Sequence, residues 1–281
     1  MKNALLIDLG GTNVRHAFFI NNALSKISKE KISDKEFIPF VTKLLNGAES
    51  KIEYLVIAAA GPNNQGFINL TNRNLLINSS ELEAALNLKK CLLLNDWEAV
   101  AFSLSEMEKK SFLSIKGNVP SNKNTLLIGP GTGLGVTLII DDQIIPTEFG
   151  NVLSATKSMM ESFGIERSEK FLSLENILSG PGIEMLFEEK FGKKLSSEKI
   201  ITLALEKNED ALFIVNNFLK TLISIIDDLV LSFTCKRVIL GGAILNSLKS
   251  ILTSEKILSY FSSRINPKYS QLIEEVQVDL L

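Results

Sequence analysis

The stretch ALLIDLGGT, residues 4–12, places four apolar residues directly before an acidic residue and a pair of glycines. Such a run is typical of a β-strand that ends at the ligand-binding edge of an α/β sheet. Two adjacent glycines let the backbone present successive N–H groups to one anion, because no Cβ blocks the approach. The stretch therefore predicts a strand and a phosphate-facing loop, with a plain strand end and β-turn as the alternative.

The same pattern recurs along the rest of the chain. Further apolar runs end at glycine or polar residues, and segments with helical spacing of three and four lie between them. This alternation predicts an α/β fold. The chain has 281 residues, enough for two lobes, which we place at residues 1–105 and 106–281, with residues 105–123 as a surface connection. The predicted strands lie at residues 54–60, 91–94, 125–128 and 237–240, and the predicted helices at 81–88, 183–191 and 211–232.

Composition excludes several functional classes. Thirty basic and 32 acidic residues nearly balance and form no dense basic stripe, so nucleic acid is not an expected partner. Cys91 and Cys235 lie in or beside apolar runs and are expected as core residues in a reducing compartment. No export signal is visible, and the apolar segment 211–233 carries charged residues that disfavour a membrane span. We expect a cytoplasmic protein with no membrane partner.

A second glycine loop, GPGTGLG at residues 129–135, superficially resembles a dinucleotide-binding fingerprint. That fingerprint must open a helix, whereas residues 136–140 are largely β-branched and lead into a turn at Asp141 and Asp142. The sequence therefore predicts a hairpin that closes on phosphate, and it disfavours a dehydrogenase.

Two acidic residues follow predicted strands. Asp8 could hold Mg²⁺ directly or through water, because magnesium prefers hard oxygen ligands. Asp96 stands between the run 92–94 and a helix start, where a carboxylate can act as a base. The alternative for Asp96 is a residue that only caps that helix.

The chain resembles the bacterial glucokinase family, within the superfamily that shares its ATPase core with hexokinase, actin and the heat-shock chaperones. The matching segments run in family order over nearly the whole chain. They are DLGGTNVR (8–15), LLLNDWEAVA (92–101), GPGTGLGV (129–136), EFGN (148–151), LENILSGPG (174–182) and VILGGAI (238–244). The resemblance implies a two-lobed, ribonuclease H-like fold with a ligand cleft between the lobes.

The resemblance also implies the roles of individual residues. Asp96 would be the general base that takes the proton of the sugar hydroxyl, in the phosphorylation of glucose to glucose 6-phosphate. Asp8 would hold Mg²⁺. The implied MgATP residues are Gly10, Gly11, Thr12, Asn13, Gly131, Thr132, Gly133, Gly241 and Gly242. The implied sugar ligands are Asn72, Asn95, Asp96, Glu148, Asn151 and Glu175.

The sequence departs from the family in ways that leave alternatives open. The family usually has histidine where Asn151 stands and glycine where Phe149 stands, so the identity of the hexose stays open. Leu75 replaces an aromatic residue, and the family continues past its last strand into a helix, whereas this sequence ends at Leu281. The alternatives are a kinase for another hexose or amino sugar and a weakened sugar- or nucleotide-binding relative. A sugar-responsive repressor is disfavoured, and a homodimer is common in the family.

Overall fold

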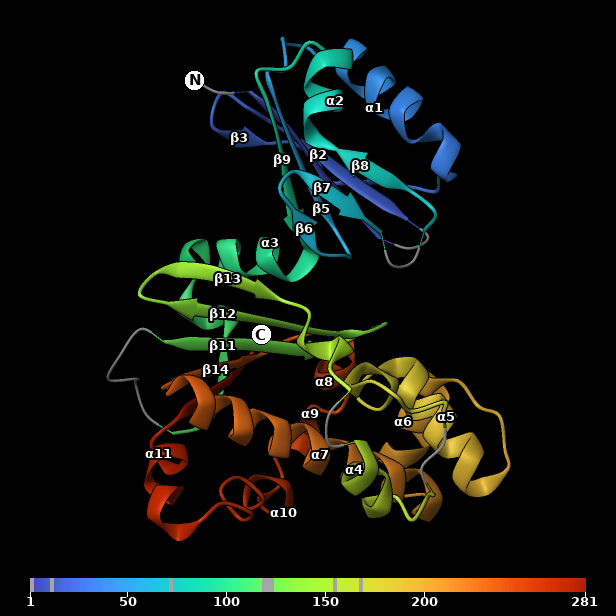
Figure 1. Cartoon of the computed structure of the whole chain (residues 1–281), viewed down its shortest axis with the longest axis vertical. Helices are drawn as coiled ribbons and strands as arrows, with labels where there is room; N and C mark the ends of the chain where they lie inside the picture. Colours follow the sequence, from blue (N-terminus) through green and yellow to red (C-terminus); the bar gives the residue numbers. More distant parts are fainter. Residues whose placement is uncertain (1–2, 11–12, 71–72, 118–123, 154–155, 167–168) are drawn as a thin grey trace. The chain divides into compact units, whose positions relative to one another are not determined.

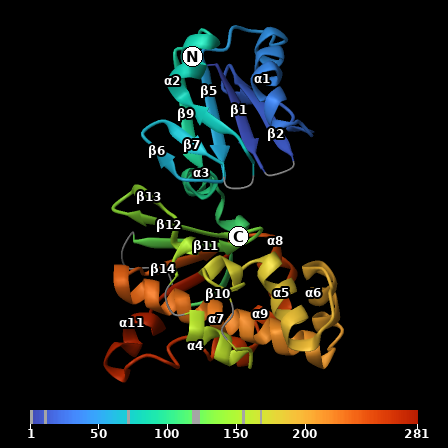
Figure 2. The same ribbon diagram turned by 45° about the vertical axis from the view of Figure 1, so that its right-hand side comes forward.

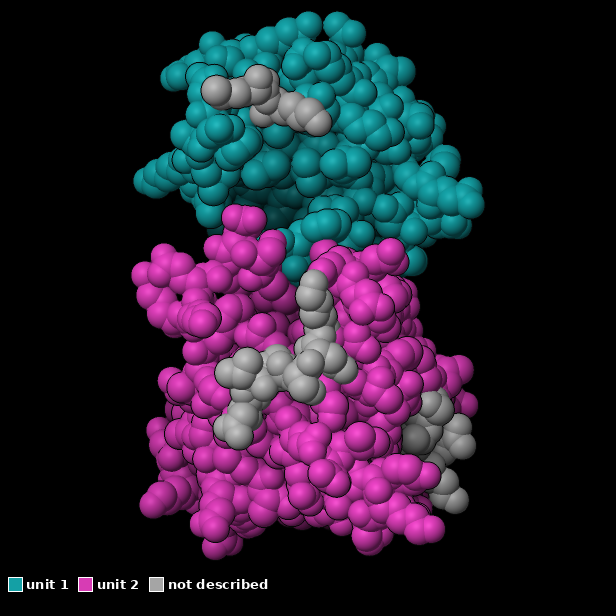
Figure 3. All heavy atoms as spheres, turned by 90° about the vertical axis from the view of Figure 1, so that its left-hand side faces the viewer, with its two compact units in different colours: residues 1–103 teal, residues 104–281 magenta. Residues whose placement is uncertain are grey.

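The computed structural model describes residues 3–10, 13–70, 73–117, 124–153, 156–166 and 169–281. The chain divides into two compact units, residues 1–103 and residues 104–281 (Figure 3). Each unit has its own sheet and its own hydrophobic core.

Unit 1 is built on a sheet whose main path runs β3-β2-β1-β5-β9, with β4 paired to β2 (Figure 1). Strands β1 and β2 form an antiparallel hairpin, whereas β1, β5 and β9 are parallel. A small antiparallel sheet, β6-β7-β8, follows β5. The strands are β1 (Ala4–Leu9), β2 (Val14–Ile20), β3 (Ala23–Leu24), β4 (Ser28–Glu30), β5 (Tyr54–Ala59), β6 (Asn63–Asn64), β7 (Phe67–Asn69), β8 (Leu76–Asn78) and β9 (Lys90–Asn95).

Buried apolar residues occupy alternate positions along β1, and this pattern explains how unit 1 forms its core. Leu5, Ile7 and Leu9 are buried and belong to one cluster with Phe37 and Val41 of α1. Because successive strand residues point to opposite faces, this pattern sends the apolar set to one side of the sheet. The helices of unit 1 are α1 (Phe37–Asn46), α2 (Ser79–Ala85), α3 (Asp96–Ser103) and the 3-10 turn η1 (Asp34–Glu36).

Unit 2 repeats the same strand order. Its sheet runs β10-β15-β14-β11-β12-β13, so an antiparallel β11-β12-β13 meander is followed by the parallel strands β14 and β15, as β1-β2-β3 is followed by β5 and β9. The sheets of the two units thus share one strand order. The strands are β10 (Leu113–Lys116), β11 (Thr125–Pro130), β12 (Leu134–Ile140), β13 (Gln143–Thr147), β14 (Arg237–Leu240) and β15 (Gln277–Leu280).

The long helix α7 (Glu209–Phe233) packs along one side of the second sheet (Figures 1 and 2). It begins at Asn208, whose side chain accepts a hydrogen bond from the Ala211 N–H, and its buried face supplies much of the unit 2 core. Within the described ranges, no helix combines the length and apolar composition needed to span a bilayer. The other helices are α4 (Thr156–Ser162), α5 (Gly180–Phe191), α6 (Ser197–Leu205), α8 (Ala243–Ser247), α9 (Lys249–Leu252), α10 (Glu255–Leu258) and α11 (Ser270–Glu274), with 3-10 turns η2 (Leu104–Glu106), η3 (Lys109–Ser111), η4 (Phe149–Asn151), η5 (Leu174–Asn176) and η6 (Pro267–Tyr269).

Most of the predicted elements are confirmed, and one is wrong. Residues 134–140 form a strand that turns back at Asp141 and Asp142, as the hairpin prediction requires. Residues 105–123 were expected as a surface connection, but residues 113–116 form strand β10, which pairs with β15 across a register shift. Four residues at the outer edge of a sheet, two apolar and two polar, give too short an alternation to detect in the sequence.

Candidate functional site

The parallel strands of unit 1 end at one common edge. The register pairs Leu9 with Ala59 and Ala59 with Asn95, so the ends of β1, β5 and β9 lie level. Asp8 and Asp96 therefore both lie at this edge. The negative charge of Asp8 contributes to raising the pKa of Asp96, so the two carboxylates interact.

Helix α3 starts directly from β9, and Asn95 provides its cap. The Oδ1 atom of Asn95 accepts from the N–H of Trp97 at 2.9 Å and from that of Glu98 at 3.4 Å. The Glu98 carboxylate accepts from the Asn95 N–H at 3.1 Å, which completes a capping box. The Asn95 amide nitrogen donates to the Gly61 carbonyl at 3.2 Å. Both polar ends of this buried side chain thus already have protein partners.

Asp96 is partly buried. Burial is the main cause that raises the pKa of its carboxyl group, and Asp8 adds to the effect, while the hydrogen bond from the Trp97 N–H opposes it. That bond reaches Oδ1 at 2.8 Å. The backbone N–H of Asp96 itself also lowers this pKa. Among the described residues, Trp97 is the one other residue with a hydrogen bond to the Asp96 carboxylate. A carboxylate with few donors and a raised pKa is suited to accept a proton.

The first glycine loop connects β1 to β2. The Gly10 N–H donates to the Asn13 carbonyl at 3.0 Å, and the Gly10 carbonyl accepts from Arg73 Nε at 3.0 Å. Gly11, Thr12 and Asn72, three of the predicted ligands, lie outside the described residues.

Asp8 accepts a 2.6 Å bond from Arg15, its partner across the β1–β2 pair. No group of three or more His, Cys, Asp and Glu side chains in the described ranges could hold a metal ion. A Mg²⁺ ion that arrives with nucleotide needs fewer protein ligands, because it keeps several waters and binds the phosphates. The half-exposed Asp8 carboxylate, with Asp96 beside it, fits that requirement.

The second glycine loop closes the β11–β12 hairpin of unit 2. The Gly131 N–H donates to the Gly133 carbonyl at 2.8 Å, and the Gly131 carbonyl accepts from the Gly180 N–H at 2.8 Å. A Cβ built on Gly131 would have no atom of the described residues within 4 Å, its chain neighbours aside. The backbone is therefore open to an approaching group at this position, and Thr132 beside it is exposed.

The amino ends of two helices, α5 and α8, lie against this loop. Helix α5 has Ser179 as its cap, and Gly180 in its first turn bonds to Gly131. Helix α8 is preceded by Gly242, which has a left-handed φ of 100° and would bring a Cβ to 2.8 Å from the Pro130 carbonyl oxygen. The amino end of the 12-residue α5 favours a negatively charged ligand because its first N–H groups lack intrahelical partners. Gly241 donates to Ile128 and continues the β14 pairing.

The predicted acids of unit 2 lie on two neighbouring 3-10 turns. Glu148 precedes η4, and its Oε2 accepts from the Asn151 amide at 3.1 Å. Glu175 lies in η5, which is joined to the η4 segment by a 3.2 Å backbone bond from Leu174 to Val152. A Cβ on Gly133 would come to 2.6 Å from the Glu175 carboxylate. Unit 2 therefore places Glu175 directly against the glycine loop, near Glu148 and Asn151.

Two residues that sequence reasoning did not select take part in these arrangements. Gly180 bonds to the second loop, and Arg73 bonds to the first. Gly180 lies in the quoted segment LENILSGPG, so its motif was a usable signal. Nothing local in the sequence marks Arg73, whose partner Gly10 is 63 residues away.

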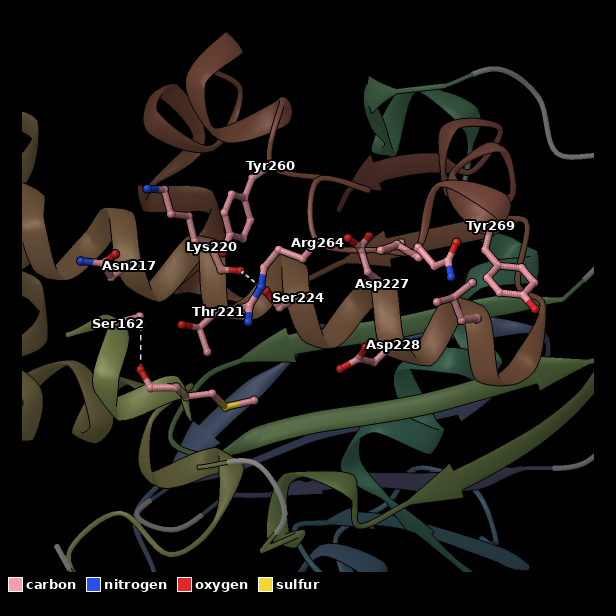
Figure 4. A pocket seen from close by; sticks show the side chains of 14 residues that line it. Ser162, Asn217, Lys220, Thr221, Ser224, Asp227, Asp228, Tyr260, Arg264 and Tyr269 are labelled. Carbon is pink, nitrogen blue, oxygen red and sulfur yellow. Dashed lines mark hydrogen bonds between the residues drawn. The ribbon is translucent and has the colours of Figure 1, made fainter. Parts of the chain in front are cut away.

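A separate cavity of unit 2 contains none of the predicted site residues (Figure 4). It lies between α7, Met159 and Ser162 of α4 and the segment 260–269, and Lys220, Asp227, Asp228 and Arg264 line it.

A model of the family described as Glucokinase matches residues 5–281. The chain belongs to the glucokinase family. The resemblance stated from six sequence segments is thereby confirmed, and so is the two-lobed α/β fold of the actin-like ATPase type.

The individual relatives also carry glucokinase names, although their sequence identity to this chain is low. The chain is 28% identical to a glucokinase-like protein of Xylella fastidiosa, over 92% of this chain and 85% of that protein. It is 27% identical to a glucokinase of Pseudomonas paraeruginosa, over 66% of this chain and 58% of that protein, so the match spans under two thirds of this relative. Among solved structures, glucokinase from an Antarctic psychrotroph has a TM-score of 0.81 at 26% identity, covering 100% of this chain and 94% of that one. This glucokinase family chain is thus similar to sugar kinases in both sequence and fold.

Proposed function

We propose that this chain transfers the γ-phosphoryl group of ATP to a hydroxyl of a hexose, with glucose as the favoured substrate and glucose 6-phosphate as the product. The observation that carries the proposal is the state of Asp96. Its carboxylate lies at the strand edge beside Asp8, has a raised pKa and, among the described residues, accepts a hydrogen bond from one other residue, Trp97. Membership in the glucokinase family supports the same reaction class.

Asp96 acts as the general base. The hexose hydroxyl oxygen bonds to the γ-phosphorus, the bond from that phosphorus to the bridging oxygen of ATP breaks, and ADP leaves. The hydroxyl proton passes to Asp96. In phosphoryl transfer most of the rate comes from alignment and charge stabilisation rather than from the base, so the contribution of Asp96 is about 10²- to 10⁴-fold.

Each unit by itself offers backbone groups suited to a phosphate. In unit 2 the supporting observations are the open face of Gly131 and the amino end of α5 behind it. In unit 1 the corresponding group is the loop after β1, which includes Gly10 and Asn13. Asp8 is the residue that would hold a magnesium ion, which would supply neutralisation of the phosphate charge. Gly241 and Gly242, at the end of β14, lie beside the nucleoside.

The proposed sugar ligands are Glu148 and Glu175 in unit 2 and Asp96 in unit 1. Glu148 and Glu175 accept hydrogen bonds from hydroxyl groups, and Asn151 orients Glu148 through their 3.1 Å bond. Asn95 contributes less than the sequence suggested, because its side chain caps α3 and bonds to Gly61. Asn72 remains a predicted ligand. A site of this kind rejects a sugar whose missing or inverted hydroxyl leaves a carboxylate unpaired.

The test is a coupled ATP-consumption assay over glucose, mannose, fructose, glucosamine and N-acetylglucosamine, with the phosphorylated position of each product assigned by NMR. The proposal expects kcat/KM to be highest for glucose and phosphate to be attached at the 6-position. If kcat/KM is highest for an amino sugar, the assignment as a sugar kinase stands and the assigned substrate changes. Hexose-independent ATP hydrolysis with no sugar phosphate formed would overturn the proposal.

A further inference from the structure

The cavity beside α7 in unit 2 is large enough for a small organic molecule. Its volume is about 390 Å³, within the range of about 300–1,000 Å³ that ligand pockets usually have. One water molecule occupies roughly 30 Å³, so a single structural water would fill little of this space. The residues that line it all belong to unit 2, and none of them is assigned to the phosphoryl-transfer site.

Helix α7 presents a polar stripe to this cavity. The lining residues of the helix recur at intervals of three and four, so they share one face. They are Asn217, Lys220, Thr221, Ser224, Asp227, Asp228 and Leu231. Tyr260 and Arg264, from the segment before η6, also line the cavity (Figure 4). Because Lys220 and Asp227 are seven residues apart, their positions along the helix axis differ by about 10 Å.

The two basic residues of the cavity, Lys220 and Arg264, form no ion pair with a described residue. The Lys220 ammonium lies 5.6 Å from the centroid of the Tyr260 ring, which holds it at the cavity wall. Partial burial raises the pKa of Asp228, and the positive charge of Arg264 opposes that rise, so the guanidinium lies near this acid. Two cations without an ion pair favour an anionic group, and a planar guanidinium suits phosphate.

Two buried polar side chains on the same helix face have spare hydrogen-bonding capacity. Thr221 is 5% exposed, and its hydroxyl forms no hydrogen bond with a described residue. Asp227 is 4% exposed; its Oδ2 accepts from the Ser262 N–H at 2.9 Å, whereas no described partner contacts Oδ1. Buried polar atoms without partners are uncommon in folded proteins. Hydroxyl groups of a bound molecule would supply the partners of both residues.

The combination of these groups selects the class of ligand. Inorganic phosphate would use only the two cations. An amino acid would offer one ammonium to the acids and would leave the neutral polar side chains of the stripe without partners. A phosphorylated sugar carries one dianionic group and several hydroxyl groups, so it can bind the cations and the polar stripe at the same time.

We propose that this cavity binds a phosphorylated sugar, with the phosphate at Lys220 and Arg264 and the hydroxyl groups at Thr221 and Asp227. The inference is independent of the proposed kinase function, since it uses none of the residues assigned to that reaction. A hexose 6-phosphate is the product of the proposed reaction and belongs to this class of ligand. Glucose 6-phosphate is therefore the first probe.

The experiment records methyl NMR spectra of the full chain, labelled at methionine and isoleucine, during titration with glucose 6-phosphate, inorganic phosphate or glutamate. Saturating glucose is present throughout, so that the sugar site around Asp96 is occupied. Met159 and Ile265 line the cavity, whereas Met107 does not. Glucose 6-phosphate should shift the signals of Met159 and Ile265 saturably and leave Met107 unchanged. Its Kd should be at least about 10-fold lower than that of inorganic phosphate or glutamate.

Variants of the cavity test the two ends of the ligand separately. Lys220→Met and Arg264→Gln each remove a cation that faces the phosphate, and each should raise the Kd about 10-fold or more. Thr221→Val removes a hydroxyl group and keeps the shape of the side chain, so it should raise the Kd about 3- to 10-fold. Lys199→Met is the matched control, because Lys199 is an exposed cation of α6 outside the cavity. This control and Asp96→Asn should both keep the native Kd.

Four results would overturn the proposal. The first is the absence of saturable shifts at Met159 and Ile265 up to about 10 mM glucose 6-phosphate. An equal Kd for inorganic phosphate would show an anion site only, and a lower Kd for glutamate would show a different ligand class. Native affinity in both Lys220→Met and Arg264→Gln would place the ligand elsewhere. Should one of these two variants fail to fold, the other carries the comparison.

Discussion

Asn95, rather than its neighbour Asp96, provides the capping box at the start of α3: Asn95 Oδ1 accepts from Trp97 and Glu98, and Glu98 accepts in return from the Asn95 N–H. This arrangement answers the simplest objection to a catalytic Asp96, which is that the carboxylate only satisfies a helix end. Asp96 shares the Trp97 N–H but does not complete the cap. The cap and the base are therefore separate residues.

The capping role of Asn95 predicts a loss of stability on truncation. Asn95→Ala removes the cap and leaves buried groups unpaired, so it should lower the free energy of unfolding by about 1–3 kcal/mol. Asn95→Ser keeps an oxygen that can cap and loses the bond to Gly61 without adding a charge beside Asp96 and Glu98, so its loss should be smaller. Urea unfolding measures both, and equal losses in the two variants would argue against the cap.

The interaction between Asp8 and Asp96 predicts a pH effect. The raised pKa of Asp96 means that the base becomes protonated, and activity falls, at a higher pH than for an ordinary aspartate. Asp8→Asn removes the neighbouring negative charge, so the acid limb of kcat/KM should move to lower pH, even where kcat itself is reduced. Arg15→Gln keeps the charge of Asp8 and should not lower that limb. An unchanged limb in Asp8→Asn would show that the carboxylates do not interact.

The two glycines at the second loop predict opposite phenotypes. Gly131→Ala adds a methyl group where, its chain neighbours aside, no atom of the described residues lies within 4 Å, so Tm should stay near native while KM for ATP rises about 10-fold or more. Gly242→Ala forces alanine into φ 100° and toward the Pro130 carbonyl, and should cost about 1–3 kcal/mol of stability. Calorimetry measures the Tm of both variants, and initial rates measure their KM for ATP. A native KM for ATP in Gly131→Ala would remove that backbone from the phosphate site.

The cavity of unit 2 contains the buried residue Asp227, whose raised pKa should make stability depend on pH. Burial raises the pKa of Asp227 to about 6; Lys116 opposes this rise, and Asp228 adds to it. The Asp227 Oδ2 accepts from the Ser262 N–H at 2.9 Å, but no described partner contacts Oδ1.

Because the folded state binds this proton more tightly than the unfolded state, the contribution of Asp227 to stability decreases as pH rises from about 4 to about 6. Asp227→Asn cannot lose that proton. Its stability relative to native should therefore increase over this range, by on the order of 2 kcal/mol at neutral pH. Thermal unfolding at several pH values checks this. A difference that does not change with pH would contradict it.

The sequence could predict the fold because its strands are apolar runs that end at abrupt glycine or polar stops. Residues 136–140 were recognisable as a strand since they are largely β-branched, and in the structure the strand β12 begins two residues earlier, at Leu134. Strand β10 was not recognisable, because a short edge strand with two apolar and two polar residues is stabilised by its pairing with the distant strand β15, where Leu113 lies opposite Leu280.

The site was predictable only in part, for a similar reason. Asp8, Asp96 and the glycines lie in local motifs, so their residue types carry the signal. The contact of Arg73 with Gly10 and that of Gly180 with Gly131 join distant segments, and only the folded chain brings them together. The sequence also suggested Asn95 as a sugar ligand, whereas the folded chain engages its side chain in capping and in the bond to Gly61.

The most direct test of the whole account is the turnover of Asp96→Asn with saturating ATP and the best hexose, measured together with its affinity for ADP. Asparagine keeps the shape of the side chain but cannot take the hydroxyl proton. The account predicts that turnover falls about 10²- to 10⁴-fold while ADP affinity and Tm stay near native. Turnover within a few-fold of native would contradict the role of Asp96 and, with it, the proposed mechanism.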